Sequence, residues 1–301
     1  MNTKKFKAAL LATTFLSLTA TISPSQDFEM GLNAYRARDY QTARAEWTPL
    51  AQGGDANAQF RLGLLYQLTS MLGLEEPEVY SEGIKWIHEA AVQGHAHAQH
   101  ELGLAYLKGK GVPQDHLQAA EWLKVAADQS FALSQYELGV LFRDGTGVSQ
   151  DFAVATSWFQ LAAEQGHLDA QNNLGARYFS GQGVHQDFET ALFWFRSAAE
   201  KGNATGQSNL GAMYVNGQGV LQDLSKAYMW ITLAADDDYK LGTTAETMTY
   251  SPNNTVKSLA SAVDQWNENL VMLEDYMTQA EVAEAKVNAA RCIASEYSEC
   301  Q

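Results

Sequence analysis

The chain of 301 residues lacks a membrane-spanning segment, a basic charge balance and, over most of its length, cysteine. Its longest apolar stretch, Ala8 to Ala20, has 13 residues, whereas a membrane-spanning helix needs about 20. Acidic residues outnumber basic ones by 35 to 20, which gives a formal charge of −15. Such a chain repels the phosphates of nucleic acids and of anionic membranes. We therefore expect no nucleic acid among its partners and no membrane insertion.

The N-terminal residues have the features of an export signal. Three lysines precede the apolar stretch, at Lys4, Lys5 and Lys7. A positive segment followed by a short apolar one is typical of a secretory signal peptide. The pattern predicts a signal peptide over residues 1–25, with cleavage after Ala20 or after Ser25, and a soluble mature protein that is periplasmic or secreted.

Cysteine occurs only near the C-terminus, at Cys292 and Cys300. In an exported chain, an even and closely spaced pair indicates a disulfide. In the chain-entropy model, closing so short a loop stabilises the fold by about 2–3 kcal/mol. The alternative is a pair of free thiols in a frayed tail.

Several signatures of cofactor binding and catalysis are missing. The Gly-x-Gly turns of the sequence lack both the third glycine of a dinucleotide-binding loop and the Lys-Ser or Lys-Thr of a P-loop. There is no Gly-x-Ser-x-Gly segment. His95, His97 and His100 lie close together, but no further fixed ligand of a metal site is evident near them. We predict no metal, no cofactor and no catalytic residue.

What the chain does have is a repeat. Leu-Gly pairs recur at Leu62-Gly63, Leu102-Gly103, Leu138-Gly139, Leu174-Gly175 and Leu210-Gly211. Tryptophans keep a spacing of 36 residues, at Trp86, Trp122, Trp158, Trp194 and Trp230. A fixed period between 20 and 50 residues is the signature of a solenoid.

The repeat centred on Leu138 shows the expected local structure. Gly145 suits the left-handed residue that ends a helix, and Gly147 permits a tight reversal. Asp151 stands where the next helix needs an N-cap. The glycine of the Leu-Gly pair lets the neighbouring helix approach, and small alanines opposite the large Trp stack one repeat on the next. The fold class predicted is all-α, a superhelical solenoid of antiparallel helix pairs with C-terminal capping helices.

The pattern A-x-x-x-L-G-x-x-Y-x-x-G-x-G-V-x-x-D-x-x-x-A-x-x-W-x-x-x-A-A-x-x-G resembles the Sel1-like repeat family, relatives of the tetratricopeptide repeat. It covers residues 55–238 in five copies. The resemblance implies a right-handed superhelix that serves as a protein-interaction scaffold, and many bacterial members are exported. Some members of a cysteine-rich branch are described as penicillin-binding or weakly β-lactamase-active. This chain departs from that branch, because it has no cysteine between residues 27 and 291.

The flanking segments are predicted to close the array. Residues 27–54 resemble a tetratricopeptide hairpin, with Asp39 as an N-cap. Residues 239–254 show no periodicity and predict a loop, and residues 255–301 predict capping helices and a tail. The apolar stripe over 259–277 either covers the last repeat or forms a dimeric coiled coil; we expect the former, and a monomer.

Two smaller features complete the pattern. The first repeat carries an insert over 69–77, which is either neutral or a contact loop. Thr278 and Glu281 have the spacing of a capping box, which predicts that a final helix begins there.

The residues one and two positions before each repeating Leu are expected to be exposed and to line an inner groove. They are His100, Glu101, Tyr136, Glu137, Asn172, Asn173, Ser208 and Asn209, here called the groove residues. By analogy with tetratricopeptide repeats, Asn173 and Asn209 are best placed to hold a peptide backbone or carboxylate. The alternative is an ordinary solvated helix face.

The leading hypothesis is a non-catalytic scaffold of the bacterial periplasm that binds a protein or peptide partner in this groove. One alternative is an enzyme of cell-wall or β-lactam chemistry, as in the cysteine-rich relatives, although the missing repeat cysteines argue against it. Another is a cell-wall glycan (peptidoglycan) binder, in which exposed aromatic rings such as Tyr136 stack on sugars.

Overall fold

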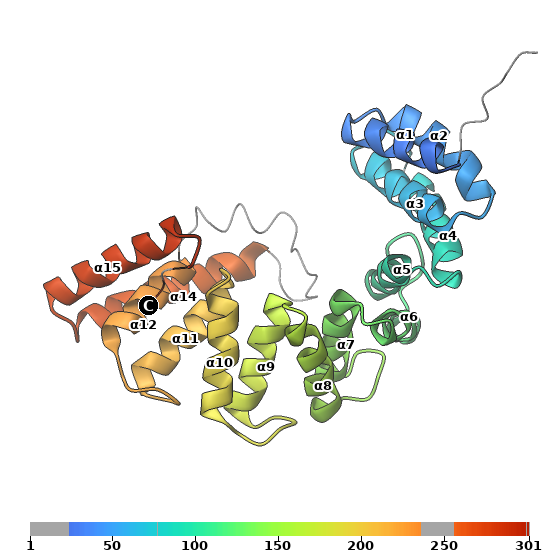
Figure 1. Ribbon diagram of the computed structural model, residues 1–301. Helices are drawn as coiled ribbons and strands as arrows, with labels where there is room; N and C mark the ends of the chain where they lie inside the picture. The colour runs from blue at the N-terminus through green and yellow to red at the C-terminus, as the bar shows by residue number, and fades with distance from the viewer. Residues whose placement is uncertain (1–23, 77, 236–255, 299, 301) are drawn as a thin grey trace, which may run out of the picture.

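The computed structural model describes residues 24–76, 78–235, 256–298 and 300 (Figure 1). Over these residues the protein consists of fourteen helices and no strands. The all-α prediction is therefore confirmed. Residues 1–23 of the predicted signal peptide and the whole predicted loop over 239–254 lie outside the described residues.

Ten helices form five antiparallel pairs that stack into a curved array (Figure 1). The first helices of the pairs are α3 (Ala56–Met71), α5 (Ala96–Lys108), α7 (Ala132–Asp144), α9 (Leu168–Ser180) and α11 (Ala204–Asn216). The second helices are α4 (Glu78–Val92), α6 (His116–Asp128), α8 (Phe152–Glu164), α10 (Phe188–Ala199) and α12 (Leu224–Ala235). Before them lies the hairpin of α1 (Pro24–Arg36) and α2 (Tyr40–Gln52), and each helix from α1 to α12 contacts the next. This is the predicted solenoid.

The glycine of each Leu-Gly pair forms a hole for one large side chain of the second helix. A Cβ placed on Gly139 would lie 2.7 Å from the ring of Phe159, which is fully buried. The other pairs are Gly63 with Ile87, Gly103 with Leu123, Gly175 with Phe195 and Gly211 with Ile231. The expected close approach is confirmed, but the side chain that fills the hole belongs to the residue directly after the repeating Trp in the sequence. Trp158 itself is only half-buried.

The Gly-x-Gly turn joins neighbouring repeats as well as neighbouring helices. Gly145 ends α7 with a positive φ of 71°, and Asp151 caps α8 by accepting from Ala153 N and Val154 N. Both roles agree with the prediction. A Cβ on Gly147 would lie 2.0 Å from the carbonyl oxygen of His116. The second glycine is therefore needed because the turn packs directly on the start of the preceding repeat's second helix.

A row of buried glutamines also links the repeats, which the sequence reasoning missed. They lie three residues before each Leu, at Gln59, Gln99, Gln135, Gln171 and Gln207. Each donates its amide to a main-chain carbonyl at the end of the preceding second helix, as Gln135 does to Ala127 O at 3.2 Å. The Gln135 oxygen in turn accepts from Gln165 Nε2 at 2.7 Å. Such paired amides satisfy the polar groups that the stacking buries.

The N-terminal hairpin packs on the first repeat and, like the repeats, uses an N-capping Asp and a large side chain packed against a glycine. Asp39 accepts from Thr42 N and caps α2, as predicted. Trp47 fills the space beside Gly31, and its indole N–H donates to Phe28 O at 3.2 Å. Within the predicted insert, Glu75 pairs with Arg44 of α2 at 2.6 Å.

Helices α14 (Val256–Glu274) and α15 (Gln279–Ala294) cover the last repeat. Trp266 and Leu273 of the apolar stripe are buried in one cluster with Trp230 of α12. The described part of the stripe thus packs against the array as expected. The capping box of Thr278 and Glu281 opens α15, as predicted.

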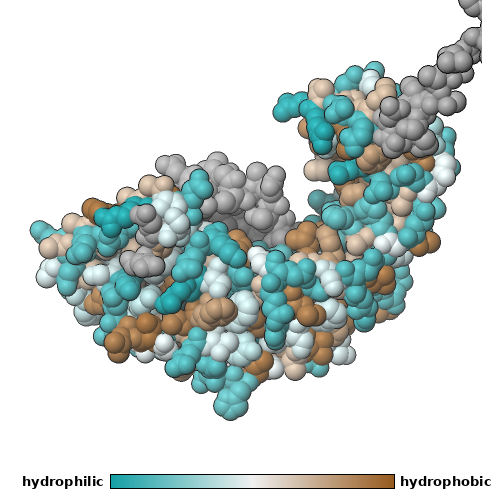
Figure 2. Space-filling view, viewed as in Figure 1, coloured by the Kyte–Doolittle hydropathy of each residue, from teal (hydrophilic) through white to brown (hydrophobic). Residues whose placement is uncertain are grey.

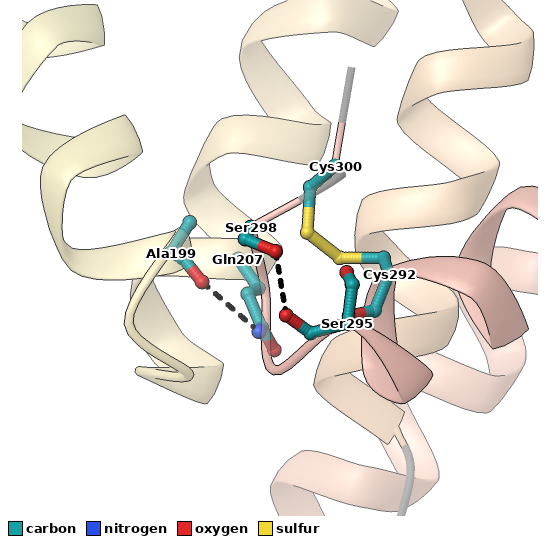
Figure 3. The surroundings of a disulfide bond; sticks show 6 residues. All are labelled: Ala199, Gln207, Cys292, Ser295, Ser298 and Cys300. Atoms are coloured by element: carbon teal, nitrogen blue, oxygen red, sulfur yellow. Dashed lines mark hydrogen bonds between the residues drawn. A yellow bond between two sulfur atoms is a disulfide. The ribbon is translucent and has the colours of Figure 1, made fainter.

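The predicted disulfide joins Cys292 of α15 to Cys300, with Cα atoms 4.8 Å apart (Figure 3). Both cysteines are buried. Figure 3 also shows the turn between them, in which Ser298 Oγ donates to Ser295 O at 2.7 Å. The bridge fastens the tail to the covering helices. None of the helices in the described part of the chain has the length and apolar character required to cross a bilayer.

Candidate functional site

The first helices of successive repeats approach one another across the array. Helices α9 and α11 contact each other although α10 separates them in sequence. Helices on the inner side of an arc approach more closely than those on its outer side, so the first helices line the inner side. The space-filling view is hollowed along the inside of this arc (Figure 2). The groove residues lie on these helices.

The expectation that the groove residues are all exposed is wrong for His100 and Glu137, which are 7% and 3% exposed. The cause is the close approach of α5 and α7, because His100 Nδ1 and Ser134 Oγ share a hydrogen bond of 2.9 Å. The ring of Phe131 packs edge-on against the same imidazole. The other six groove residues are half-buried.

Burial changes the protonation of these two side chains. It lowers the pKa of His100 to about 4, helped by the charge of Lys108, so the imidazole is neutral. It raises the pKa of Glu137 to about 7, and Lys108 opposes that rise. Burial also raises the pKa of Glu101, again against the field of Lys108. The charge of Lys108 therefore acts on both carboxyl groups and partly balances them within the protein.

Tyr136 is packed against other rings. It stacks on His167 with a centroid separation of 4.5 Å and an interplanar angle of 17°, and it contacts Phe159 at 5.9 Å. Burial raises the pKa of its hydroxyl. A platform for a sugar needs an open ring face, and the stacked His167 covers one face of Tyr136.

Asn173, singled out by analogy, is already engaged within the protein. Its oxygen accepts from Arg143 Nη1 at 3.1 Å, and its amide nitrogen donates to Asp169 O at 2.8 Å. Arg143 is itself held by both carboxylate oxygens of Asp144. Asn173 thus fixes the contact between α7 and α9, which leaves it less free to clamp a ligand.

Asn172 and Asn209 form the pair that remains suited to a ligand. Asn209 Nδ2 donates to Asn172 Oδ1 at 2.8 Å, which joins α9 to α11. Among the described residues, no other side-chain hydrogen bond of this pair is found, and both amides are half-buried. The Asn172 nitrogen and the Asn209 oxygen therefore offer a donor and an acceptor side by side. A peptide unit presents the complementary acceptor and donor.

The histidine group at the start of α5 has a structural role. His95 Nδ1 accepts from Ala98 N at 3.2 Å and so caps the helix. His167 caps α9 in the same way, through Ala170 N. Nowhere in the described ranges do three His, Cys, Asp or Glu side chains gather in a way that suits a metal ion.

Known proteins match this chain over the same repeats. The family model described as Sel1 repeat matches residues 56–95, 96–131, 132–167, 168–203 and 204–239. No curated protein matches the chain. A Sel1 repeat protein from Oxalobacter formigenes is 32% identical, over 69% of this chain and 84% of that one, with a TM-score of 0.64.

A second solved structure extends the likeness beyond the repeats. It is c5321, a protective antigen present in uropathogenic Escherichia coli strains and displaying an SLR fold. It is 25% identical over 89% of this chain and 62% of its own length, with a TM-score of 0.69. Proteins built from Sel1 repeats are generally protein-interaction scaffolds rather than catalysts. With its residues 56–239 matched in five consecutive units, the chain belongs to the Sel1 repeat family.

Proposed function

We propose that this protein is a non-catalytic adaptor, exported to the bacterial periplasm, that binds an extended segment of another protein in its inner groove. The Asn172–Asn209 pair carries the proposal. It holds two amides in fixed register between α9 and α11, and an extended backbone presents the complementary groups. Sequence-tolerant recognition of this kind suits an adaptor.

The electrostatics of the groove support a polypeptide partner over an enzymatic role. Lys108 partly balances Glu101 and Glu137, and Arg143 is held by Asp144 and Asn173. Ionisable groups that pair with one another in this way build the interface between repeats. Acid–base catalysis instead requires a titrating group directed at a substrate.

Two features support export. The basic and then apolar N-terminal sequence has the order of a secretory signal. The Cys292–Cys300 bridge is typical of oxidising compartments such as the periplasm.

Site-specific photo-crosslinking tests the proposal. A photoreactive residue at Ser208, the groove residue beside Asn209, is compared with one at Gln160, an exposed position on the second helix α8. In bacterial envelope extract we expect discrete protein adducts at position 208, absent at position 160 and weakened by Asn172→Ala. Equal adducts at both positions, or none above background at position 208, would contradict groove binding. Labelling by a fluorescent penicillin or co-sedimentation with peptidoglycan would instead support the enzymatic or glycan alternative.

A further inference from the structure

A pocket of about 450 Å³ lies where α11, α12 and α14 meet. Ser208, the groove residue next to Asn209, is part of its lining. The pocket therefore continues the groove at its C-terminal end. Neither its location nor its chemistry follows from the repeat pattern, because α14 is not part of a repeat.

The interior of this pocket is apolar and its rim is polar. Ile231 and Leu273, both nearly buried, line it together with Val215 and Leu224. The amides of Asn216 and Asn269 are also part of the lining, and none of the lining residues carries a charge. An apolar cavity with a few polar groups is the usual form of a site that accepts an apolar group and orients it.

Two large side chains of the lining are left open to solvent. Met272 is 56% exposed and Tyr276 is 80% exposed. Because both line the same pocket, they form one exposed apolar surface with it, and contiguous surfaces of this kind mark interaction sites. A flexible Met and an amphipathic Tyr are side chains that adapt to a bound partner.

The surroundings of the pocket carry negative charge. Glu268 and Asp275 lie four residues before and three residues after Met272 on the same chain, and both are exposed. Residues three and four apart are neighbours on a helix surface, although Asp275 lies just beyond the end of α14. The chain as a whole has a charge of −15. Complementarity of charge therefore selects a basic partner and accelerates its association.

From this geometry we propose that the pocket takes one large aliphatic or aromatic side chain of the bound polypeptide, with lysine or arginine on either side of it. The proposal rests on the groove function above and specifies the partner's chemistry. The backbone lies along Asn172 and Asn209, the apolar side chain enters between α11 and α14, and the flanking cations face Glu268 and Asp275.

Fluorescence anisotropy with designed peptides tests the inference. The probe is a labelled peptide with Leu-Phe at its centre and Lys-Lys on either side. Two matched peptides replace either Leu-Phe by Ser-Gly or every Lys by Glu. We expect the probe to bind the full protein at least tenfold more tightly than either matched peptide. Equal binding of all three, or no binding of the probe, would overturn the inference.

Variants locate the binding. Ala212 lines the pocket and is exposed, so Ala212→Trp fills the cavity from its solvent side. Val271 is exposed on the same helix as Met272 but does not line the pocket, so Val271→Trp is the matched control. We expect at least a tenfold loss with Ala212→Trp and less than a twofold change with Val271→Trp. Met272→Ser, which removes an exposed side chain, provides a second test should Ala212→Trp unfold.

The outcomes separate the pocket from the groove. If Asn209→Ala weakens the probe but Ala212→Trp and Met272→Ser do not, the pocket inference fails while groove binding stands. If Ala212→Trp instead dissociates a dimer seen in sedimentation, the occupant is a second copy of the chain and the inference is overturned. Loss of affinity in Ala212→Trp with an unchanged monomer supports it.

Discussion

Alanine at Gly147 tests whether the second glycine of each turn is a contact between repeats. Gly147 has a φ of 71°, and a Cβ there would lie 2.0 Å from the carbonyl oxygen of His116. Gly166 has a φ of 89°, and a Cβ there would meet nothing within 4 Å. Both Gly147→Ala and Gly166→Ala place a side chain at positive φ, but only the first forces two repeats apart. Gly166→Ala is therefore the matched control.

The expected loss of stability has two sources, the left-handed backbone conformation and overpacking. A left-handed conformation costs a non-glycine residue about 1–2 kcal/mol, which applies to both variants. Overpacking adds roughly 1–3 kcal/mol, which applies to Gly147→Ala alone because the obstacle is main chain. We expect Gly147→Ala to be the less stable by about 2 kcal/mol, or roughly 4–8 °C in melting temperature.

Far-UV circular dichroism during thermal and urea unfolding measures the difference. Because a repeat array can unfold in parts, the two variants are compared by midpoint and by the breadth of the transition. Equal destabilisation would refute the packing argument, since backbone strain alone would then explain both.

Three further predictions follow from buried groups. Within the described residues, Gln171 Oε1 is buried and has no hydrogen-bond partner, and Lys201 occupies the position of the donating glutamine of earlier repeats. Lys201→Gln should therefore raise the free energy of unfolding by about 1 kcal/mol, and Lys201→Ala should not. Burial raises the pKa of Glu137 from 4.5 to about 7. The stability that its protonated carboxyl contributes is therefore complete below the pKa of the unfolded state and is lost as the pH rises through the pKa of the folded state. Between about pH 5 and pH 8, Glu137→Gln should remove a decline of on the order of 2 kcal/mol in the free energy of unfolding, measured by urea unfolding at each pH; a pH profile parallel to that of the wild-type protein would contradict this. Reduction of the Cys292–Cys300 disulfide should lower stability by about 2–3 kcal/mol in the chain-entropy model, and an unchanged melting curve after complete reduction would count against that estimate.

The features predicted from the sequence are those set within one repeat. Gly145 and Asp151 act through their own backbone neighbours, so their spacing alone predicts a helix end and a helix start. The buried glutamines recur with the same period as the Leu-Gly pairs, so the sequence alone could have pointed to them. They were missed because glutamine has no fixed role in a helix, and only the structure shows that Gln135 reaches the preceding repeat.

The features that escaped prediction depend on the distance between repeats. His100 and Glu137 occupy positions expected to be exposed, yet the approach of α5 and α7 buries them. The approach of α7 and α9 engages Asn173 with Arg143, and the approach of α9 and α11 joins Asn172 to Asn209, which are 37 residues apart. Helical periodicity within one repeat carries no information on how closely the next one lies.

The most direct test of groove binding is calorimetric titration with the partner segment identified by crosslinking at position 208. The affinities to compare are those of the wild-type protein, the double variant Asn172→Ala with Asn209→Ala, and the outer-face control Gln160→Ala. Loss of two hydrogen bonds of about 1 kcal/mol each predicts at least a tenfold weaker complex for the double variant and an unchanged one for the control. An unchanged affinity in the double variant would contradict the account.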